Sequence, residues 1–422
     1  MGVIPTPNSG ELRSVLISYI SRPTPPGNQV EPISAHCYDK GLQTPHTPVD
    51  ITAQMSGIPT QLENPLASEG AHTSDEKFFR HEVALAFRNR GIPSEALRLP
   101  ITPTGMHYLL NHFDVPIIDA KTWKLSIGGL VGAPFSLTLD DIKSLPSVTM
   151  PVTMECAGNG RTFMDPRVVN QPWMHEAVST AEWTGTPLKA VIERAGLSSD
   201  AIELLFTGLD YGIQSDIEQF YQRSLTIDQA MRDEVILAYE MNGAPLEPQH
   251  GAPLRLVVPG WYGMTNVKWL DRIEAIDTAF DGLQMQFYRE TSGADDDGSA
   301  IETMKVRALM APPGWNTFPT LKRCVDAGPQ TLIGRAWAGQ KSISRVEVST
   351  DNGASWSDAV LDDPIGEYAW RGWSFEWNAT VGQHTLVVRA TDSEGVAQPL
   401  DQTWSFYGVA NNGVASTEVE VR

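Results

Sequence analysis

The sequence contains little cysteine, and its three cysteines lie far apart. Cys37, Cys156 and Cys324 form no CxxC pair and no CxxCH motif within the 422 residues, which excludes a zinc knuckle and a covalently attached haem. A disulfide scaffold is not expected in a chain of this length, and such sparse cysteine is typical of a reducing compartment.

Basic residues are scarce relative to acidic ones. There are 31 Lys and Arg against 51 Asp and Glu, which gives a formal net charge of −20. Binding to nucleic acid or to an anionic membrane depends on Lys and Arg, so neither partner is expected. A local basic pocket for a small anion is compatible with this charge.

Long apolar runs and export signals are also lacking. No apolar run approaches the about 20 residues that span a bilayer, so no membrane segment is expected. The N-terminal residues lack the layout of a secretory signal, and the sequence has no Arg-Arg pair. We therefore expect a cytoplasmic location, or a periplasmic one if a leader was removed.

The remaining composition is that of a globular protein with more than one domain, with 41% hydrophobic and 19% charged residues. Residues 1–75 are rich in Pro, Ser, Thr, Gly and Asn and predict an extended arm. A helix-like segment begins at Asp75. Residues 76–295 mix strand-like pieces with helix-like pieces at 139–144 and 188–195, and Pro and Gly interrupt them often. This texture predicts an α+β domain whose chemistry lies on loops.

A second domain is predicted after the acidic, glycine-containing segment 292–300. Short alternating segments follow, in which apolar residues such as Val346 and Val348 alternate with polar ones, the pattern of a half-buried strand. The segments are 332–337, 344–350, 370–377, 384–392 and 404–407. Their spacing predicts a β-sandwich over residues 300–410, with a tail at 411–422.

The most informative motif is MECAGNGR at residues 154–161. Cys156 leaves a strand-like run and enters a loop of Ala, Gly and Asn, whose small side chains let the backbone approach a bulky group. The nearby Arg161 would lower the pKa of the thiol and favour metal ligation or nucleophilic attack. The residues alone leave open a blander interpretation, a buried core cysteine at a turn.

This octet resembles the sulfite oxidase family of molybdopterin enzymes, in which CAGN followed by an arginine carries the cysteine that ligates molybdenum. The similarity continues in order from about residue 80 to 408. Its further motifs are NH (111–112), FTGLD (206–210), AYEMNG (238–243), HGAPLR (250–255), VKWL (267–270), VEVSTDNGASW (346–356) and YAWRGWSFEW (368–377). The resemblance implies a molybdopterin-binding catalytic domain at 76–295 and an immunoglobulin-like dimerisation domain at 300–410.

The resemblance also implies the residues of a site. Cys156 would be the metal ligand, because a soft thiolate suits molybdenum held by a dithiolene. Residues that would hold the pterin and its phosphate are Asn111, His112, Asp210, His250, Arg255, Asn266 and Lys268. Residues that would contact the substrate are Arg161, Trp173, Tyr288 and Arg371. Cations can bind a phosphate, and an aspartate can accept from pterin N–H groups. Taken singly, each has an ordinary alternative as a turn, loop or solvated strand residue.

The sequence departs from the family directly before the Asn-His pair, where relatives carry an arginine and this chain has Leu110. Sulfite is a small, largely doubly charged anion that needs charge-assisted donors, so the departure weakens a sulfite assignment unless Arg161 and Arg371 suffice, or Arg167 or His175 substitutes. Three interpretations stay open. They are oxidation of sulfite or of a less charged or larger sulfur compound, reduction of an S-oxide, N-oxide or nitrate-like oxyanion, and a non-catalytic β-sandwich assembly protein.

The partners follow from the same reading. No convincing pair of haem-ligating histidines and no flavin or NAD motif is found, so we expect no haem and a separate electron acceptor, such as a cytochrome c. The acidic charge would suit a basic cytochrome. The resemblance implies a homodimer formed through the second domain, and a twofold pair is the commonest assembly.

Overall fold

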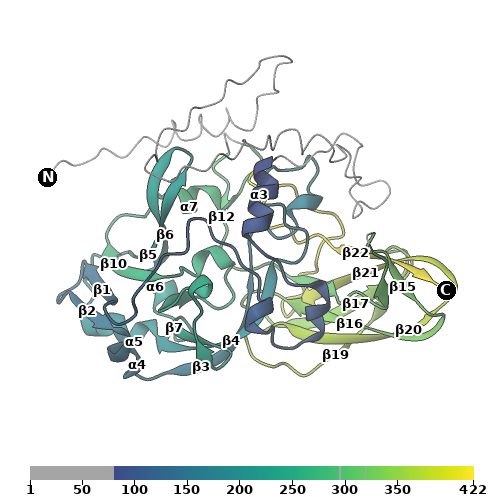
Figure 1. Ribbon diagram of the computed structural model, residues 1–422, viewed down its shortest axis with the longest axis horizontal. Coiled ribbons are helices and arrows are strands. Elements are labelled where there is room, and N and C mark those ends of the chain that lie inside the picture. Colours follow the sequence, from purple (N-terminus) through teal and green to yellow (C-terminus); the bar gives the residue numbers. More distant parts are fainter. Residues whose placement is uncertain (1–79, 294–295, 319) are drawn as a thin grey trace, which may run out of the picture. The chain divides into compact units, whose positions relative to one another are not determined.

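The computed structural model describes residues 80–293, 296–318 and 320–422 (Figure 1). The predicted arm at 1–75 and the helix start at Asp75 lie outside these residues. The described chain begins with α3 (Arg80–Arg88) and two short 3-10 turns, Ser94–Arg98 and Thr104–Met106. Among the described residues, no helix is long and apolar enough to cross a membrane.

The first sheet is mixed, and several short helices contact its strands. Its order is β2-β1-β10-β5-β6, with β1 parallel to β10 and the other neighbours antiparallel. The elements are β1 (Lys124–Gly129), β2 (Phe135–Thr138), α4 (Leu139–Lys143), α5 (Leu188–Ala195), β5 (Glu203–Gln214), β6 (Ile217–Thr226), α6 (Ile227–Ala230) and β10 (Leu270–Ile276). A capping box of Thr138 and Asp141 starts α4. The helix-like pieces expected at 139–144 and 188–195 are confirmed as α4 and α5.

The second sheet carries the cysteine motif. β3, β4, β7 and β8 are neighbours in that order, and β9 pairs with β7. The elements are β3 (Val148–Glu155), β4 (Val178–Pro187), β7 (Ile236–Met241), β8 (Ala244–Pro245) and β9 (Arg255–Val257). The short helix α7 (Leu283–Phe287) contacts β6 of the first sheet. Cys156 follows β3 directly, so the strand delivers it to one end of the second sheet.

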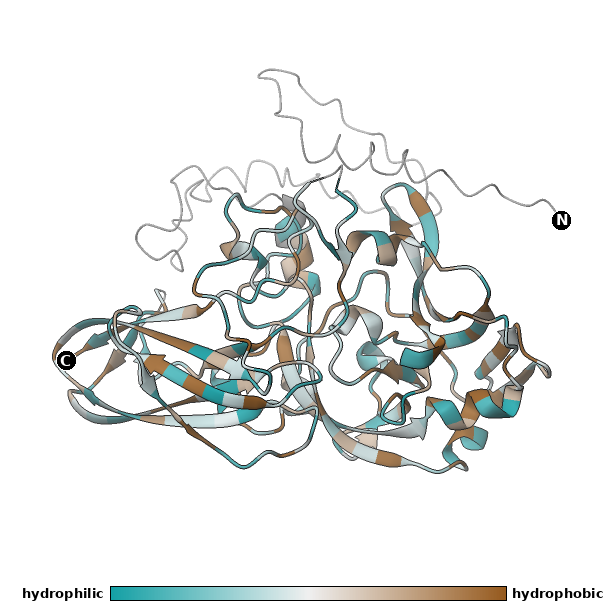
Figure 2. Cartoon of the chain, turned by 180° about the vertical axis from the view of Figure 1, so that it is seen from behind, coloured by the Kyte–Doolittle hydropathy of each residue, from teal (hydrophilic) through white to brown (hydrophobic). Residues whose placement is uncertain are grey.

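A short hairpin leads into a two-sheet sandwich. One sheet has the order β13-β16-β20-β19 and the other β14-β15-β22-β21-β17-β18. The strands are β11 (Arg289–Glu290), β12 (Ser299–Ala300), β13 (Arg307–Met310), β14 (Trp315–Asn316), β15 (Arg323–Val325), β16 (Gly328–Trp337), β17 (Ile343–Ser349), β18 (Ser357–Asp358), β19 (Val360–Leu361), β20 (Arg371–Ala379), β21 (Gly382–Asp392) and β22 (Ala415–Val421). Hydrophobic and hydrophilic residues alternate along several of these strands (Figure 2), as the sequence predicted.

Two expectations about the end of the sandwich are wrong. Residues 404–407 form no strand, and the expected tail at 411–422 contains β22, which lies between β15 and β21. The reason is the alternation in β22, where Val419 and Val421 are buried and the residues between them are not. The closing strand of the sandwich therefore lies about ten residues beyond the place that the sequence indicated.

Three apolar cores hold these layers together. One fills the first domain between its mixed sheet, α4, α5, β7 and β9, and another lies inside the sandwich, where Trp373 and Trp377 are buried. The third core contains Cys156 and joins β3 and β4 to sandwich residues such as Leu309, Trp337 and Trp370. The metal-ligand candidate therefore sits in a core that both domains build.

Candidate active site

Cys156 is held at the start of a tight loop. Its N–H donates to Ala177 O (2.9 Å), and its carbonyl accepts from Asn159 N (2.9 Å). Gly160 has a positive φ of 85°, a conformation that L side chains rarely adopt. The small residues of the motif thus form a turn that presents the thiol, as the sequence indicated.

The thiol lines a pocket that brings together side chains from distant segments. The expected residues among its walls are Cys156, His112, Asp210, His250, Arg255, Asn266, Lys268 and Tyr288. Asn111 is buried behind this wall, where its Oδ1 accepts from Lys268 Nζ. The structure therefore gathers the proposed metal ligand and all the expected cofactor-binding residues in one place.

Two basic side chains on one side of the pocket are fixed by backbone carbonyls. Lys268 Nζ donates to Leu110 O (3.0 Å) and Gln249 O (3.1 Å). Arg255 donates to His250 O (3.0 Å) and Asn266 O (3.1 Å), and its guanidinium lies 4.8 Å from the centre of the Trp183 ring. Both cations are thus oriented in advance, without a carboxylate of the chain within ion-pair distance among the described residues.

The pocket also contains buried polar atoms that have no hydrogen-bond partner in the described chain. They are Asp210 Oδ1, His250 Nε2, Arg255 Nε and His107 Nε2. Buried polar atoms are normally paired, so a cluster of orphans calls for a ligand. An acceptor carboxylate beside fixed cations fits a group that carries both N–H donors and a phosphate. The residues present therefore fit a molybdopterin cofactor.

The charge states in the pocket reflect burial among cations. Burial, together with the smaller effect of neighbouring positive charges, lowers the pKa of His250 to about 4 and the pKa of His107 to about 3. Burial raises the pKa of Asp210 to about 7, against the opposing charge of Lys268, whose own pKa burial lowers. An anionic ligand would relieve the repulsion among these groups.

Around the thiol, Arg161 and Tyr288 are fixed by the fold. Burial raises the pKa of the Cys156 thiol, and the charge of Arg161 acts in the opposite direction. Arg161 is buried, and it donates through Nε to Gly408 O (2.8 Å) and through Nη1 to Gln171 O (2.8 Å). The hydroxyl of Tyr288 lies 3.1 Å from His112 Nε2. Trp173 is buried in the same core as Cys156.

One residue predicted for the site is not brought to it. Arg371 begins β20, and its guanidinium donates to Asp362 O (2.9 Å) and Ile343 O (3.0 Å), both within the sandwich. The neighbouring Trp370 faces the first domain and donates to Pro100 O (2.7 Å). Successive strand residues point to opposite faces, so Arg371 points away from the first domain. The structure therefore does not bring Arg371 to the pocket with the other expected residues.

The two residues considered as substitutes for the missing arginine are also occupied elsewhere. Arg167 forms an ion pair with Glu82 at 2.6 Å. His175 Nδ1 lies 2.7 Å from Arg307 Nη2, and the ring stacks on Phe163. Leu110 lines the pocket itself, and neither of these two side chains supplies the missing charge.

The sequence reasoning missed several lining residues. They are His107, Tyr108, Tyr221, Gln249 and Met264. His107 Nδ1 lies 3.0 Å from Tyr108 O, which makes Nδ1 the donor and leaves Nε2 as an acceptor facing the pocket. Its place five residues before His112 was the only available signal, because no motif marks it.

The buried histidines predict how the stability of the cofactor-free protein depends on pH. The pKa values of His107, His112 and His250 are about 3, 4 and 4 when folded, against 6.5 for an ordinary histidine. Their contribution is fully present above about 6.5 and is lost as the pH falls toward 4, at about 1.4 kcal/mol per pH unit for each group. Asp210 acts oppositely, because its raised pKa gives a contribution that is lost as the pH rises through about 7. Urea midpoints should therefore fall between pH 7 and pH 5.

The substitution His250→Gln is the control for this dependence, since it should remove one histidine's share of the slope. A midpoint that stays constant between pH 7 and pH 5 would contradict the neutral, buried state of these rings.

Comparison with known proteins agrees with this geometry. Residues 112–284 match the family model described as the oxidoreductase molybdopterin binding domain, and residues 299–421 match the Mo-co oxidoreductase dimerisation domain. Fold and site thus define a molybdenum-cofactor oxidoreductase. Within this class, the chain belongs to the sulfite oxidase family. The family and the fold class expected from the sequence are confirmed.

The similar proteins include a sulfite oxidase, a nitrate reductase and a sulfane dehydrogenase. Human mitochondrial sulfite oxidase is 34% identical over 336 residues, which are 74% of this chain and 60% of that protein. A tomato (Solanum lycopersicum) NADH nitrate reductase is 31% identical over 74% of this chain and 37% of that protein. The sulfane dehydrogenase SoxCD from Paracoccus pantotrophus has a similar structure, with a TM-score of 0.68, 25% identity, and coverage of 89% of this chain and all of that chain. The chain thus spans about 60% of the length of the sulfite oxidase it matches.

Proposed function

We propose that this protein oxidises a sulfur compound by oxygen-atom transfer at a molybdenum cofactor and passes the electrons to a separate acceptor. The observation that carries the proposal is the pocket in which Cys156 faces fixed cations and unpartnered polar atoms. When bound, the cofactor supplies the oxygen-atom transfer and takes up two electrons. The chain's own residues bind it, orient it and shape the space for the substrate.

Different residues of the pocket bind the cofactor, orient it and shape the space for the substrate. Lys268, Arg255 and His250 bind the phosphate, because all three line the pocket and Arg255 Nε and His250 Nε2 have no partner in the described chain. Asp210 accepts hydrogen bonds from the pterin through its unpartnered Oδ1. Cys156 provides the thiolate, and Arg161 supplies a positive charge beside it. The 3.1 Å contact between His112 and Tyr288 holds the phenol hydroxyl toward the reaction space.

The substrate that this pocket favours carries less charge than free sulfite. Leu110 stands in the pocket wall where an arginine would add charge, Tyr108 and Met264 line the same pocket, and Arg371 is bonded within the sandwich. A desolvated dianion would therefore lack two of the charge-assisted donors that the family resemblance implies. The structural neighbour named a sulfane dehydrogenase supports a reduced sulfur compound as the substrate. The nitrate reductases among the relatives support the alternative direction, reduction of an oxyanion.

A substrate screen tests the proposal. The cofactor-loaded protein is mixed with sulfite or a persulfide under an artificial electron acceptor, and with nitrate or an S-oxide under an artificial donor. Faster turnover with the persulfide than with sulfite supports the proposal. Turnover only in the reducing direction, or purified protein without molybdenum from a cofactor-competent host, overturns it.

The substitution Leu110→Arg should lower the KM for sulfite. It adds a cation to a half-buried position in the pocket wall, and one charge-assisted contact is worth about 1.5–3 kcal/mol, or roughly ten- to hundredfold in affinity. Steady-state kinetics with sulfite measure the change. The control is Leu400→Arg, which adds the same charge at an exposed position. A fall in Tm with loss of cofactor would show instead that Leu110 serves packing and that the arginine is buried unpaired.

The matched dimerisation domain supports a homodimer. We expect sedimentation of the purified chain to show a dimer over a wide range of concentrations, because obligate twofold interfaces are large and apolar. A concentration-independent monomer would contradict this.

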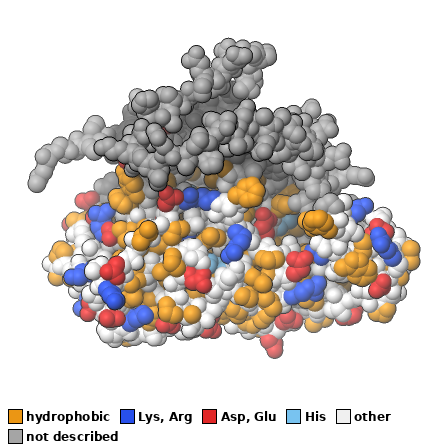
Figure 3. Space-filling model, in the orientation of Figure 1, with side chains coloured by type: hydrophobic (Ala, Val, Ile, Leu, Met, Phe, Trp, Pro, Cys, Tyr) orange, Lys and Arg blue, Asp and Glu red, His pale blue; other side chains and the backbone are white. Residues whose placement is uncertain are grey.

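The electron acceptor is a separate molecule, and a basic cytochrome c suits the net charge of −20. On the face shown in Figure 3, acidic and basic side chains of the described residues are interspersed. Attraction of a basic cytochrome therefore depends on the net negative charge of the whole chain rather than on an acidic patch of this face. Because salt screens this attraction, the rate of cytochrome reduction should fall as the ionic strength rises.

A further inference from the structure

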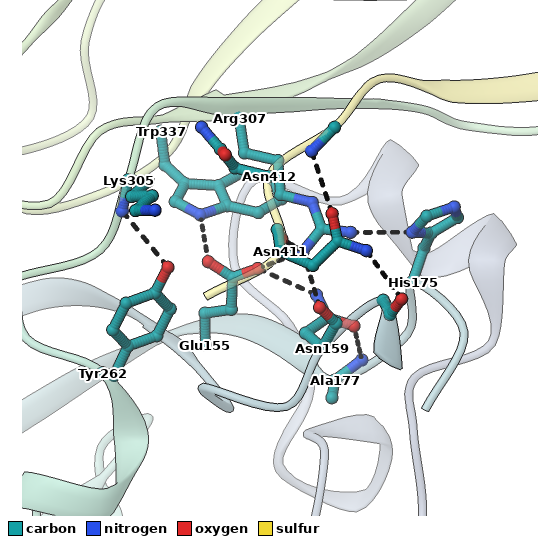
Figure 4. A network of polar contacts seen from close by, with 12 residues as sticks. Glu155, Asn159, His175, Ala177, Tyr262, Lys305, Arg307, Trp337, Asn411 and Asn412 are labelled. Atoms are coloured by element: carbon teal, nitrogen blue, oxygen red, sulfur yellow. Dashed lines mark hydrogen bonds and ion pairs between the residues drawn. The ribbon is translucent and has the colours of Figure 1, made fainter. Parts of the chain in front are cut away.

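The residue before Cys156 points away from the pocket and toward the second domain. Glu155 ends β3 and Cys156 follows it. Neighbouring residues of an extended strand point to opposite sides, and only Cys156 of the two lines the pocket. Glu155 is fully buried on the other side, among residues of the sandwich (Figure 4).

The Glu155 carboxylate is bound by two sandwich residues that are partners across a strand pair. Arg307 Nη1 lies 2.7 Å from Oε1, and Trp337 Nε1 donates to Oε2 at 2.8 Å. Arg307 in β13 and Trp337 in β16 are opposite each other in the register. Asn159 of the cysteine loop donates to the same Oε1 at 3.0 Å. One carboxylate therefore connects the start of the loop, its middle and two strands of the second domain.

Arg307 extends this connection along the loop. Its Nη1 also donates to Asn159 O (3.2 Å) and to Asn411 O (3.0 Å), and Asn411 Nδ2 in turn donates to Gly160 O (2.7 Å). A Cβ at Gly160 would come within 3.0 Å of Arg307 Nη2. The guanidinium is thus in close contact with the loop backbone.

The segment around Asn411 adds two bonds of its own. Ala410 N donates to Ala157 O (2.7 Å), and Gly408 O accepts from Arg161 Nε (2.8 Å). The loop at 156–161 is therefore bonded to the second domain near both of its ends. Its geometry, and with it the direction of the thiol, depends on that domain.

The buried ion pair between Arg307 and Glu155 restricts the position of the loop more than it adds to the stability of the fold. Arg307 and Glu155 have side chains that are 1% and 2% exposed. A buried ion pair is weak evidence for added stability, because desolvation offsets the attraction, but each of its partners requires the other in place. Any shift of the loop would break several directional bonds to one guanidinium at once.

We propose that Arg307 is a positioning residue for the metal ligand, so that the dimerisation domain is a working part of the cofactor site. Arg307 acts through Glu155, Asn159 and Asn411 and touches neither the cofactor pocket nor its walls. The inference rests on the proposed function in one respect, that Cys156 ligates molybdenum.

The first test measures the loop in the full chain without cofactor. Hydrogen exchange is followed at the amides of Cys156, Asn159 and Arg161, each bonded in the loop. Arg307→Met should raise exchange there by about tenfold or more, because local opening becomes easier. The double substitution Glu155→Gln with Arg307→Met leaves no unpaired buried charge, so it should fold like the wild type and still show the faster exchange.

Arg335→Met is the matched control. Arg335 is also a buried sandwich arginine that donates to the first domain, at Leu97 O and Arg98 O (both 2.9 Å), but it does not bond to the cysteine loop. It should leave exchange at residues 156–161 unchanged. Equal exchange in the double variant and the wild type, or an equal increase in Arg335→Met, would overturn the proposal.

The second test uses the loaded protein. At equal molybdenum content, the double variant should show a changed electron paramagnetic resonance signal of the reduced metal and a lower kcat, with less effect on KM, and Arg335→Met should show neither. An unchanged signal overturns the link from Arg307 to the metal. If the wild type holds no molybdenum, the proposed function fails, and the exchange measurement still decides whether Arg307 positions the loop.

Discussion

Cys156→Ser should abolish turnover and change the spectrum of the bound metal. A serine oxygen is a harder and much less acidic ligand than a thiolate, so it alters the ligand field and the potential of molybdenum. The loss should exceed the roughly 10–100-fold that removal of an outer partner of a ligand costs. We expect the variant to fold, since the loop around Cys156 is held by backbone bonds and by Glu155 rather than by the thiol.

Cys324→Ser is the matched control for this substitution. Cys324 is completely buried in β15 of the sandwich and does not line the pocket. Its replacement should lower the Tm, because it buries a hydroxyl, and should leave the metal spectrum unchanged. Activity per molybdenum is the quantity to compare. Full turnover of Cys156→Ser with an unchanged spectrum would show that the thiolate is not the ligand.

Lys268→Met should release the cofactor. The ammonium group is fixed by three acceptors, Leu110 O, Gln249 O and Asn111 Oδ1, and its charge opposes the effect of burial on Asp210. Losing one charge-assisted contact to a phosphate costs about 1.5–3 kcal/mol, or roughly ten- to hundredfold in affinity. Methionine keeps most of the length of the unbranched side chain but removes the charge and the three donated hydrogen bonds. Molybdenum and pterin per chain after purification measure the loss.

Lys189→Met provides the comparison for Lys268→Met. Lys189 forms an exposed ion pair with Asp233, and such pairs contribute little. Its variant should retain the cofactor in full. Should Lys268→Met retain as much cofactor as Lys189→Met, the phosphate must be bound elsewhere in the pocket.

Much of the site could be predicted because its residues lie in short, recognisable motifs. In the motif at 154–161, Gly160 adopts the positive φ that its place in the loop requires, although bonds from the second domain complete the loop. His250 ends the 3-10 turn Pro248–His250, and Arg255 begins β9 shortly after it. The family resemblance predicted that these residues share one pocket. It supplied the long-range pairing that periodicity cannot give.

The failures occurred where strand phase and distant contacts decide the outcome. Arg371 is one residue away from the buried Trp370, and a shift of one residue reverses the face of a strand. The place of β22 in the sheet depends on pairing with β15, which lies about ninety residues earlier in the chain. His107 faces the pocket only because β4 holds Tyr108, through the bond from Tyr108 N to Ser179 Oγ.

The position of β22 has a consequence for how the enzyme is made. β15 and β21 are paired through β22, and the segment before it bonds to Ala157 and Arg161. During synthesis, the first domain leaves the ribosome long before residues 408–421 do. The loop that carries the metal ligand therefore stays incomplete until residues 408–421 have been translated, and cofactor insertion must wait for them. A truncation before residue 408 would yield a first domain that cannot be loaded.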